Sequence, residues 1–559
     1  MKDKLKTAIE TALVAKGWPV VDFAVEHPAD LAHGDYATNV ALVLAKPLGE
    51  APRKVAEQLC AALQGTLPEV ASIDIAGPGF LNFHLKRSFF VDSIAEGLSQ
   101  GETWGSNHTW LGKEVLIEYT SPNLFKPLHI GNLMGNIIGE SLSRLFVFSG
   151  ATVWRINYPS DIGLTVAKAV WGIKKLGADP NDISALGAAY RHGNEAYEAD
   201  DMAKAEIVAV NQALYAGTDT ELMALRAQGI ATSRRQLDAI CERLGTHFDT
   251  VIFESEASPL GQALVKKNLG QIFTESEGAV VYEAERSGLH TRVFLNSKGL
   301  PTYEAKDLGN FAKKQAAYPD WTTSIIVTGN EQTEYFKVIF AAIRDVFQVP
   351  AERTLEHIPT GFLTLTTGKM SSRKGNVLTG ESLLEEIEEA ARERAAATRA
   401  EDLAKLTEQV AVAALKYQIL RQATGTNIVF DKERALSFEG DSGPYLQYTY
   451  ARIRSLLEKA STVGVVPSQD SAPASAYRLE RLIYQFPEVV ETALAERAPH
   501  KVTQFLTTLA GEFNAFYATE KIADSTDTSA AYKATLAALT AQTLRNGLHL
   551  LGIEVPNRM

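Results

Sequence analysis

Two hydrophobic patterns follow one another in the first hundred residues of the chain. The N-terminal segment carries apolar side chains at helical spacing, which predicts an amphipathic helix rather than a signal peptide. The later stretch ASIDIAGPGFLNFHLK alternates apolar and polar positions on both sides of a Gly-Pro-Gly sequence, which predicts two strands joined by a turn. The helical stripe consists of Leu5, Ile9, Ala12 and Leu13.

A second pattern begins at residues 115–119, VLIEY, which predict a buried strand. A proline-rich loop, TSPNLFKPLHIG, and a helix with apolar residues at helical spacing follow, and Gly150 ends this helix. Residues 152–158, TVWRINY, predict the next strand. This βαβ order predicts an α/β fold with a Rossmann-like parallel sheet, whose first loop lies where such sheets bind nucleotides.

The rest of the chain predicts two further parts. Residues 165–300 are largely helical and interrupt the sheet, which resumes with the strand 324–330 and a helix over 335–347. From about residue 400 helix follows helix, with a Ser/Pro/Ala-rich break at 466–475. We therefore expect three domains with the boundaries 1–105, 106–400 and 401–559.

Composition narrows the class of protein only a little. The chain has 559 residues, 45% of them hydrophobic, and no apolar run approaches the roughly 20 residues that cross a bilayer. Cys60 and Cys241 lie far apart without a CxxC partner, which argues against a thiolate zinc site and fits a reducing cytoplasm. The net charge of −12 disfavours nucleic-acid binding, but binding depends on local patches, so this objection is weak.

Two loops carry the candidate chemistry: PNLFKPLHIGN at 122–132 and GKMSSRKGN at 368–376. Both suit the adenylation of a carboxylate, in which the carboxylate attacks the α-phosphorus of ATP and pyrophosphate leaves. Such a reaction needs positioning and charge neutralisation rather than a protein nucleophile. His129 can donate to phosphate oxygens, and Gly131 lets the backbone approach the nucleotide. Three cations of the second loop can neutralise the β- and γ-phosphates: Lys369, Arg373 and Lys374.

These loops resemble the His-Ile-Gly-His and Lys-Met-Ser-Lys-Ser signatures of the class I aminoacyl-tRNA synthetases. The resemblance implies ATP as substrate together with Mg²⁺, and no protein-bound metal site. It implies ATP binding by the following residues of the two loops: His129, Gly131, Asn132, Lys369, Met370, Ser371, Ser372 and Arg373.

The chain departs from the two signatures at one position each. Asn132 stands where the family usually has His, so it can donate a hydrogen bond but carries no charge. Ser372 replaces the second Lys, which the arginyl family commonly tolerates. Lys126 resembles the lysine thought to compensate, and Lys374 is the alternative. The expected catalytic residues are thus Lys126, His129, Asn132, Lys369 and Lys374.

The resemblance extends to the arginyl-tRNA synthetases over nearly the whole chain. The segments that match are EYTSPNLFKPLHIGN, HGDYATNVAL (33–42), SFEGDSGPYLQYTYARI (437–453) and NGLHLLGIEVPNRM (546–559). A guanidinium is planar and offers five donors, so a selective pocket should present acceptors such as carboxylates. By resemblance, Glu118, Tyr303 and Asp307 hold the guanidinium. Asn123 and His129, helped by Gln332, orient the amino-acid end. Tyr303 and Asp307 stand four residues apart, on one helix face if that stretch is helical.

For tRNA, the resemblance implies an N-terminal α+β extra domain and a C-terminal all-helical anticodon-binding domain. Phe80 and Asn82 match positions that read the D-arm. Aromatics that stack on unpaired bases and arginines that bind phosphate are the candidates in the C-terminal domain. These are Tyr445, Gln447, Tyr448, Arg452 and Arg454. The apolar stripe of the C-terminal helices should instead lie in the core, and it comprises Phe505, Leu506, Leu509, Phe513 and Phe516.

The implied function is ligation of arginine to tRNA-Arg through arginyl-adenylate, in a cytoplasmic protein that makes no membrane contact and is a monomer by the family's default. Three alternatives stay open. The same scaffold could load another amino acid, or the chain could be a tRNA-independent ligase. A non-catalytic RNA-binding scaffold would explain the substitutions at Asn132 and Ser372, although the other signature residues are retained together.

Overall fold

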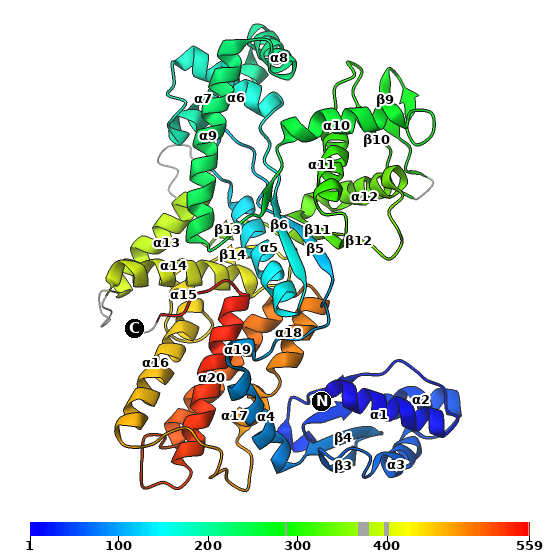
Figure 1. Ribbon diagram of the computed structural model, residues 1–559, viewed down its shortest axis with the longest axis vertical. Helices are drawn as coiled ribbons and strands as arrows, with labels where there is room; N and C mark the ends of the chain where they lie inside the picture. The colour runs from blue at the N-terminus through cyan, green and yellow to red at the C-terminus, as the bar shows by residue number, and fades with distance from the viewer. Residues whose placement is uncertain (286–287, 367–378, 396–401, 557) are drawn as a thin grey trace. The chain divides into compact units, whose positions relative to one another are not determined.

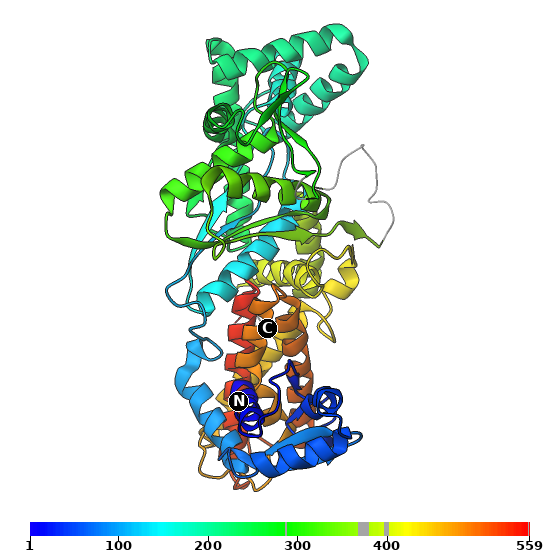
Figure 2. The same ribbon diagram turned by 90° about the vertical axis from the view of Figure 1, so that its right-hand side faces the viewer.

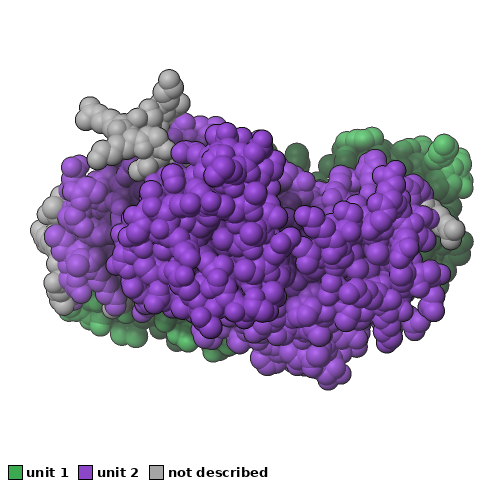
Figure 3. Space-filling model, turned by 90° about the horizontal axis from the view of Figure 1, so that it is seen from above, with its two compact units in different colours: residues 1–105, 452–489, 508–546 green, residues 106–451, 490–507, 547–559 purple. Residues whose placement is uncertain are grey.

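The computed structural model describes residues 1–285, 288–366, 379–395, 402–556 and 558–559. The chain divides into two compact units, coloured separately in Figure 3. Unit 1 comprises residues 1–105, 452–489 and 508–546, and unit 2 comprises residues 106–451, 490–507 and 547–559.

The N-terminal part of unit 1 is a four-stranded antiparallel sheet with the order β1-β2-β4-β3, covered by helices (Figure 1). Its strands are β1 (Val25–Glu26), β2 (Tyr36–Thr38), β3 (Val70–Ala76) and β4 (Phe80–Leu85). Its helices are α1 (Lys2–Ala15), α2 (Val40–Leu48), α3 (Pro52–Leu63) and α4 (Arg87–Gln100), with the short 3₁₀ turns η1 (Leu31–His33) and η2 (Gly101–Thr103).

Two local predictions for this part are confirmed. The buried residues of α1 are the four apolar residues whose spacing predicts the helix. β3 and β4 form an antiparallel hairpin whose turn includes Gly79, with a φ of +145°. A Cβ at Gly79 would also lie 2.9 Å from the carbonyl oxygen of Pro52, so both backbone and space require glycine here.

The C-terminal helices supply residues to both units. They are α16 (Gly443–Thr462), α17 (Arg478–Ile483), α18 (Phe486–Ala495), α19 (His500–Thr519) and α20 (Ala530–Leu550). The break predicted at 466–475 lies between α16 and α17. All five residues of the predicted apolar stripe on α19 are buried, so their place in the core is confirmed.

Unit 2 is built on a five-stranded parallel sheet with the order β12-β11-β5-β6-β7, which confirms the Rossmann-like class. Its strands are β5 (Glu114–Glu118), β6 (Thr152–Asn157), β7 (Thr250–Val251), β11 (Trp321–Gly329) and β12 (Thr354–Thr360). The chain proceeds from β5 to β6 and β7 on one side, and later adds β11 and β12 on the other. The border between β5 and β11 is therefore the switch point of the topology, at whose carboxyl edge open α/β sheets bind ligands.

Helices flank this sheet and fill the interruption between its halves (Figures 1 and 2). α5 (Ile130–Phe148) and α12 (Thr333–Phe347) connect neighbouring strands, and η4 (Asn330–Gln332) precedes α12. The interruption holds α6 (Leu164–Leu176), α7 (Ile183–Ala199), α8 (Asp201–Ala216), α9 (Thr220–Arg243), α10 (Glu254–Lys267) and α11 (Tyr303–Ala317). It also holds a small antiparallel sheet of β8 (Thr274–Ser276), β9 (Ala279–Tyr282) and β10 (Arg292–Leu295).

The last part of unit 2 corrects one expectation. Beyond residue 400 the sequence predicts helices alone, and α14 (Leu403–Leu420) and α15 (Lys432–Ala435) agree, as does α13 (Gly380–Ala395) before them. Yet β14 (Ile428–Phe430) pairs in parallel with β13 (Leu363–Leu365). A three-residue strand is too short for an alternating pattern to show, and its partner lies more than sixty residues away, so no local signal marks it.

Candidate active site

A pocket of about 550 Å³ lies at the carboxyl edge of the parallel sheet, at the switch point between β5 and β11. Its volume falls within the range of ligand sites in proteins. The ends of β5, β11 and β12 and the start of α5 form its walls. Its lining residues are Thr120, Ser121, His129, Ile130, Gly131, Asn132, Gly135, Val327, Thr328, Gly329, Glu331, Gln332, Thr360, Gly361, Phe362, Leu363 and Thr364.

The first signature loop enters this pocket from β5. His129 is the N-cap of α5, and its Nδ1 accepts a hydrogen bond from the backbone N–H of Gly131 at 3.1 Å. A Cβ at Gly131 would lie 3.3 Å from that nitrogen, so even alanine would press on the imidazole. The N-terminal end of a helix attracts anions through its dipole, and here the N-terminal end of α5 lies at the pocket wall. The N–H groups of Gly131 and Asn132 already donate to His129. The loop therefore offers a phosphate site.

Two residues other than glycine hold left-handed backbone conformations, one just before this loop and one within it. Thr120 has a φ of +56° and Phe125 a φ of +67°. Phe125 is buried, and its N–H donates to the hydroxyl of Ser233 on α9 at 2.9 Å. Such conformations cost of the order of 1–3 kcal/mol each and persist only where surrounding contacts fix them. The path of the loop is therefore set by packing against α9.

Partial burial changes the two titratable side chains of this loop. Burial lowers the pKa of Lys126, whose ammonium lies 5.3 Å from the centre of the Tyr190 ring. Burial, with a smaller contribution from the Lys126 ammonium, holds the pKa of His129 below its usual range, while Glu331 opposes this. The imidazole is therefore neutral near pH 7, and Lys126 is the cation closest in sequence to the phosphate site.

The second signature loop falls outside the described residues, as do all its predicted site residues: Lys369, Met370, Ser371, Ser372, Arg373 and Lys374. The described residues on either side of it lie at the pocket. Leu363 and Thr364 line the pocket before it. After it, the backbone of Thr379 forms an isolated antiparallel β-bridge with that of His129, and the N–H of Gly380 donates to the carbonyl of Leu128 at 2.8 Å. The fold thus brings both flanks of the second loop to the first.

The residues expected to bind arginine come from the end of β5, the loop that follows it, α11 and η4. Glu118 ends β5 and is 4% exposed. Asp307 accepts a hydrogen bond from the hydroxyl of Tyr335 at 2.6 Å. The backbone of Asn123 forms an isolated parallel β-bridge with that of Ser160, and Gln332 lines the pocket.

The stretch that carries Tyr303 and Asp307 is helical, since it forms α11, and the two residues lie one turn apart on it. Tyr303 is 60% exposed. Burial raises the pKa of Asp307 to about 8; the Tyr335 hydroxyl opposes this, whereas the carboxylates of Glu118 and Glu254 add to it. An acidic residue whose pKa is raised so far is a candidate functional residue.

Sequence reasoning missed the partners of these carboxylates. Glu118 accepts from the ammonium of Lys314 at 2.6 Å and from the amide of Asn310 at 2.8 Å. The spacing of Asp307, Asn310 and Lys314, at i, i+3 and i+7, places them on one face of α11. Three polar residues on a helix face that also holds the buried Phe311 were the signal available in the sequence.

The residues expected to contact tRNA differ in exposure. In unit 1, Phe80 is 39% exposed whereas Asn82 is buried in the middle of β4, between Ala37 and Asp74 of the neighbouring strands.

On α16, Tyr448 is 42% exposed and Tyr445 is partly buried. Gln447 is buried, and its amide donates to the carbonyls of Gln409 and Glu554. Arg452 and Arg454 are exposed in unit 1, with Arg452 over the ring of Tyr517. The roles of these side chains in binding tRNA stay predictions.

Comparison with known families covers almost the whole chain. Residues 1–85 match the arginyl tRNA synthetase N terminal domain, residues 93–432 the class I (R) tRNA synthetase catalytic domain, and residues 446–559 the DALR anticodon binding domain. The arginine–tRNA ligase of Treponema denticola is 30% identical over 557 residues, covering 94% of this chain and 93% of the relative. That of Treponema pallidum is 31% identical over 519 residues, covering 88% and 87%.

Solved structures agree with this comparison. The arginyl-tRNA synthetase of Thermus thermophilus has a TM-score of 0.83 at 26% identity, with both chains covered completely. The arginyl-tRNA synthetase of Plasmodium falciparum also has a TM-score of 0.83, at 22% identity, and shares the fold over 100% of this chain and 99% of its own.

Proposed function

The chain belongs to the arginyl-tRNA synthetases, and we propose that its first signature loop, the flanks of its second and the carboxylates near β5 ligate arginine to tRNA as follows. The activity is that of an arginine–tRNA ligase. An oxygen of the arginine carboxylate attacks the α-phosphorus of ATP, and pyrophosphate leaves. A ribose hydroxyl at the 3′ end of tRNA-Arg then attacks the carbonyl of arginyl-adenylate, and AMP leaves.

ATP binds in the pocket at the carboxyl edge of the sheet. The positive end of the α5 dipole and the side chains of His129 and Asn132 position the phosphates, and Gly131 leaves room for them. Lys126 supplies positive charge that Ser372 cannot, with Lys374 as the other candidate. The proposal for Lys126 is supported by its position in the loop and by its partial burial, which strengthens its interaction with an anion.

The exposed ring of Phe362 and the backbone at the end of β12 also line this pocket and offer an apolar surface for the base. Mg²⁺ accompanies ATP and neutralises phosphate charge. Among the described residues no group of three or more His, Cys, Asp or Glu side chains is placed to hold a metal. The phosphates would therefore supply most of the ligands, and Glu331 is the only carboxylate among the described lining residues.

Arginine lies beside the triphosphate, with its guanidinium toward Asp307, Glu118 and Tyr303. Asn123, His129 and Gln332 orient its amino and carboxylate groups. Asp307 carries this proposal, because its carboxylate is partly buried on α11 and has no cationic partner among the described residues. A planar cation with five donors satisfies such a site better than the point charge of lysine.

tRNA-Arg contacts the candidates whose side chains are exposed: Phe80, Tyr448, Arg452 and Arg454. Direct contact of tRNA with the buried Asn82 and Gln447 stays a prediction from the sequence. We also propose a monomeric cytoplasmic protein with domains 1–105, 106–400 and 401–559. The cytoplasmic location is supported by the use of tRNA-Arg and by two free cysteines. No helix within the described residues is long and apolar enough to span a membrane.

The test is charging of purified tRNA with each amino acid separately. The proposal requires that arginine is incorporated and that the other amino acids are not. Exchange of pyrophosphate into ATP should be measured with and without tRNA, because the family usually requires tRNA for activation. The scaffold alternative, suggested by Asn132 and Ser372, predicts tRNA binding without incorporation of arginine under any of these conditions.

A further inference from the structure

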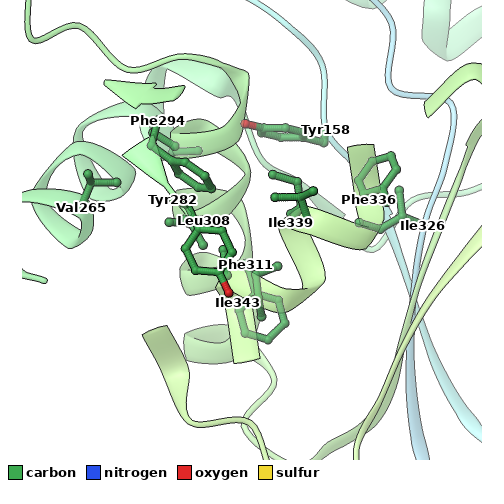
Figure 4. Close-up of a cluster of buried hydrophobic side chains, with 14 of the residues drawn as sticks. Tyr158, Val265, Tyr282, Phe294, Leu308, Phe311, Ile326, Phe336, Ile339 and Ile343 are labelled. Atoms are coloured by element: carbon green, nitrogen blue, oxygen red, sulfur yellow. The ribbon is translucent and has the colours of Figure 1, made fainter. Parts of the chain in front are cut away.

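Four carboxylates act electrostatically on the hydroxyl of Tyr158, which follows the end of β6. They are those of Glu118, Asp161, Glu254 and Asp307, and each raises the pKa of Tyr158 beyond the increase that burial causes. Figure 4 shows Tyr158 beside Ile339 and Phe336 of α12, at the edge of the apolar core of this part of unit 2. Its hydroxyl has no hydrogen-bond partner among the described residues.

Three of these carboxylates have a cation of their own. Lys314 binds Glu118 at 2.6 Å, and Lys306 binds Glu254 at 2.9 Å.

Arg226 of α9 binds Asp161, which also accepts from the hydroxyl of Ser255 at 2.7 Å. Asp161, Glu254, Lys306 and Lys314 are each at most 5% exposed. Burial without such partners would cost several kcal/mol for each charge.

Asp307 is the exception. Its hydrogen bond comes from the neutral hydroxyl of Tyr335, and no ion pair joins it to a described residue. The charged or titratable groups that face it are Glu118 from β5, Glu254 from α10, Lys314 from its own helix, Tyr158 after β6 and Tyr335 from α12. Of these four carboxylates, three are thus paired with a described cation and Asp307 is not.

We propose that Lys314, Lys306 and Arg226 fix the charge of the arginine pocket so that Asp307 alone awaits a cation, and that arginine binding releases a proton from Asp307. This inference rests on the proposed function of Asp307. In the empty pocket the carboxyl holds a proton, because its charged form has no partner. The guanidinium stays charged at every relevant pH, so its arrival stabilises the carboxylate and expels that proton. Lys314, Lys306 and Arg226 are positioning residues that act through their carboxylates.

The expected pH dependence follows from the free-enzyme pKa of about 8 for Asp307. Below this pH only the ionised fraction binds arginine, so the affinity should rise about ninefold from pH 6 to 7 and about fivefold from pH 7 to 8. Above pH 8 it should level off. At pH 7 binding should release close to one proton, whereas well above pH 8 it should release almost none.

Isothermal titration with L-arginine, in phosphate and in Tris at the same pH, measures the proton release directly. The matched variants are Asp307→Asn, which removes the proton, and Asp238→Asn, the same change at an exposed carboxylate on α9. Asp307→Asn should weaken arginine binding at pH 8 and abolish the proton release. Asp238→Asn should leave both unchanged. Circular dichroism shows whether each variant is folded.

Lys314→Met tests the charge-setting part of the inference separately. It leaves Glu118 without its cation beside Asp307, so the pH at which arginine affinity levels off should rise by about one unit or more. A merely structural role of Lys314 would weaken binding equally at every pH. If arginine binds the wild-type protein with constant affinity from pH 6 to 9 and no proton release, the inference is wrong and the proposed function stands. If arginine does not bind at any pH, the proposed function itself fails.

Discussion

Replacing Gly309 by alanine should disturb the arginine pocket although it changes no side chain that is expected to bind arginine. Gly309 lies on α11, two residues after Asp307, where α11 meets α10. A Cβ at Gly309 would lie 1.9 Å from the carbonyl oxygen of Ala257 and 2.8 Å from the N–H nitrogen of Gly261. The closest neighbours are backbone atoms, which cannot rotate away as a flexible side chain would. The two helices must therefore separate.

The size of the effect follows from these distances. Ordinary contact begins at 3.4 Å, so the helices must move apart by somewhat more than 1 Å at this crossing. Forcing one extra methyl group into a packed contact costs about 1–3 kcal/mol, and more where the backbone resists. The same movement would pull Glu254 of α10 away from Lys306 of α11, now 2.9 Å apart. The arginine site is thus disturbed while the ATP pocket, which α10 does not line, is preserved.

Equilibrium denaturation and steady-state aminoacylation measure the two consequences. Gly309→Ala should lower the denaturant midpoint and raise the KM for arginine about tenfold or more, with the KM for ATP within twofold of wild type. Gly511→Ala is the control, because it lies within α19 with no atom within 4 Å of the added Cβ. Alanine there should be neutral or stabilise by about 0.5–1 kcal/mol. Wild-type stability and an unchanged arginine KM for Gly309→Ala would refute the reasoning.

Three further predictions concern the other parts of the site. Lys126→Ala should lower the rate constant of adenylation, measured in a single turnover, at least tenfold, equivalent to about 1.4 kcal/mol. An unchanged rate constant would assign the role to Lys374. An inflection of kcat/KM for ATP that comes from His129 should lie below pH 6.5, because partial burial lowers the pKa of His129 in the free enzyme; an inflection at or above pH 6.5 that disappears in His129→Asn would count against this. Phe80→Ala should raise the KM for tRNA several-fold while the KM for arginine stays constant; equal tRNA KM values for variant and wild type would remove Phe80 from the tRNA surface.

Much of the fold can be predicted from the sequence because its main elements have strong local patterns. The spacing of apolar residues on α1 is the spacing of its buried face, and the alternation around Gly79 is that of a hairpin. The buried strand β5, the loop to His129 and α5 form one continuous pattern, so the position of the first signature loop follows from the chain order. Each of these predictions depends on residues that are neighbours in sequence.

The rest depends on contacts between distant residues. Nothing near Glu118 in the sequence indicates that Lys314 binds it, because α11 reaches β5 only through tertiary packing. Gln447 resembles an exposed polar residue in its helix, yet it is buried because the carbonyls of Gln409 and Glu554 accept from its amide. Asn82 is buried by neighbouring strands in the same way. Periodicity reports apolar burial, whereas polar burial requires a partner that the local sequence does not reveal.

The central claim is that the pocket at the β5–β11 switch point holds ATP and that the neighbouring Asp307 holds the guanidinium of arginine. The most direct measurement is the pair of KM values, for arginine and for ATP, in tRNA-Arg charging by Asp307→Asn. The account predicts a KM for arginine raised about a hundredfold, equivalent to about 2.7 kcal/mol, with the KM for ATP within twofold of wild type. An unchanged KM for arginine, or an equal loss for both substrates, would contradict it.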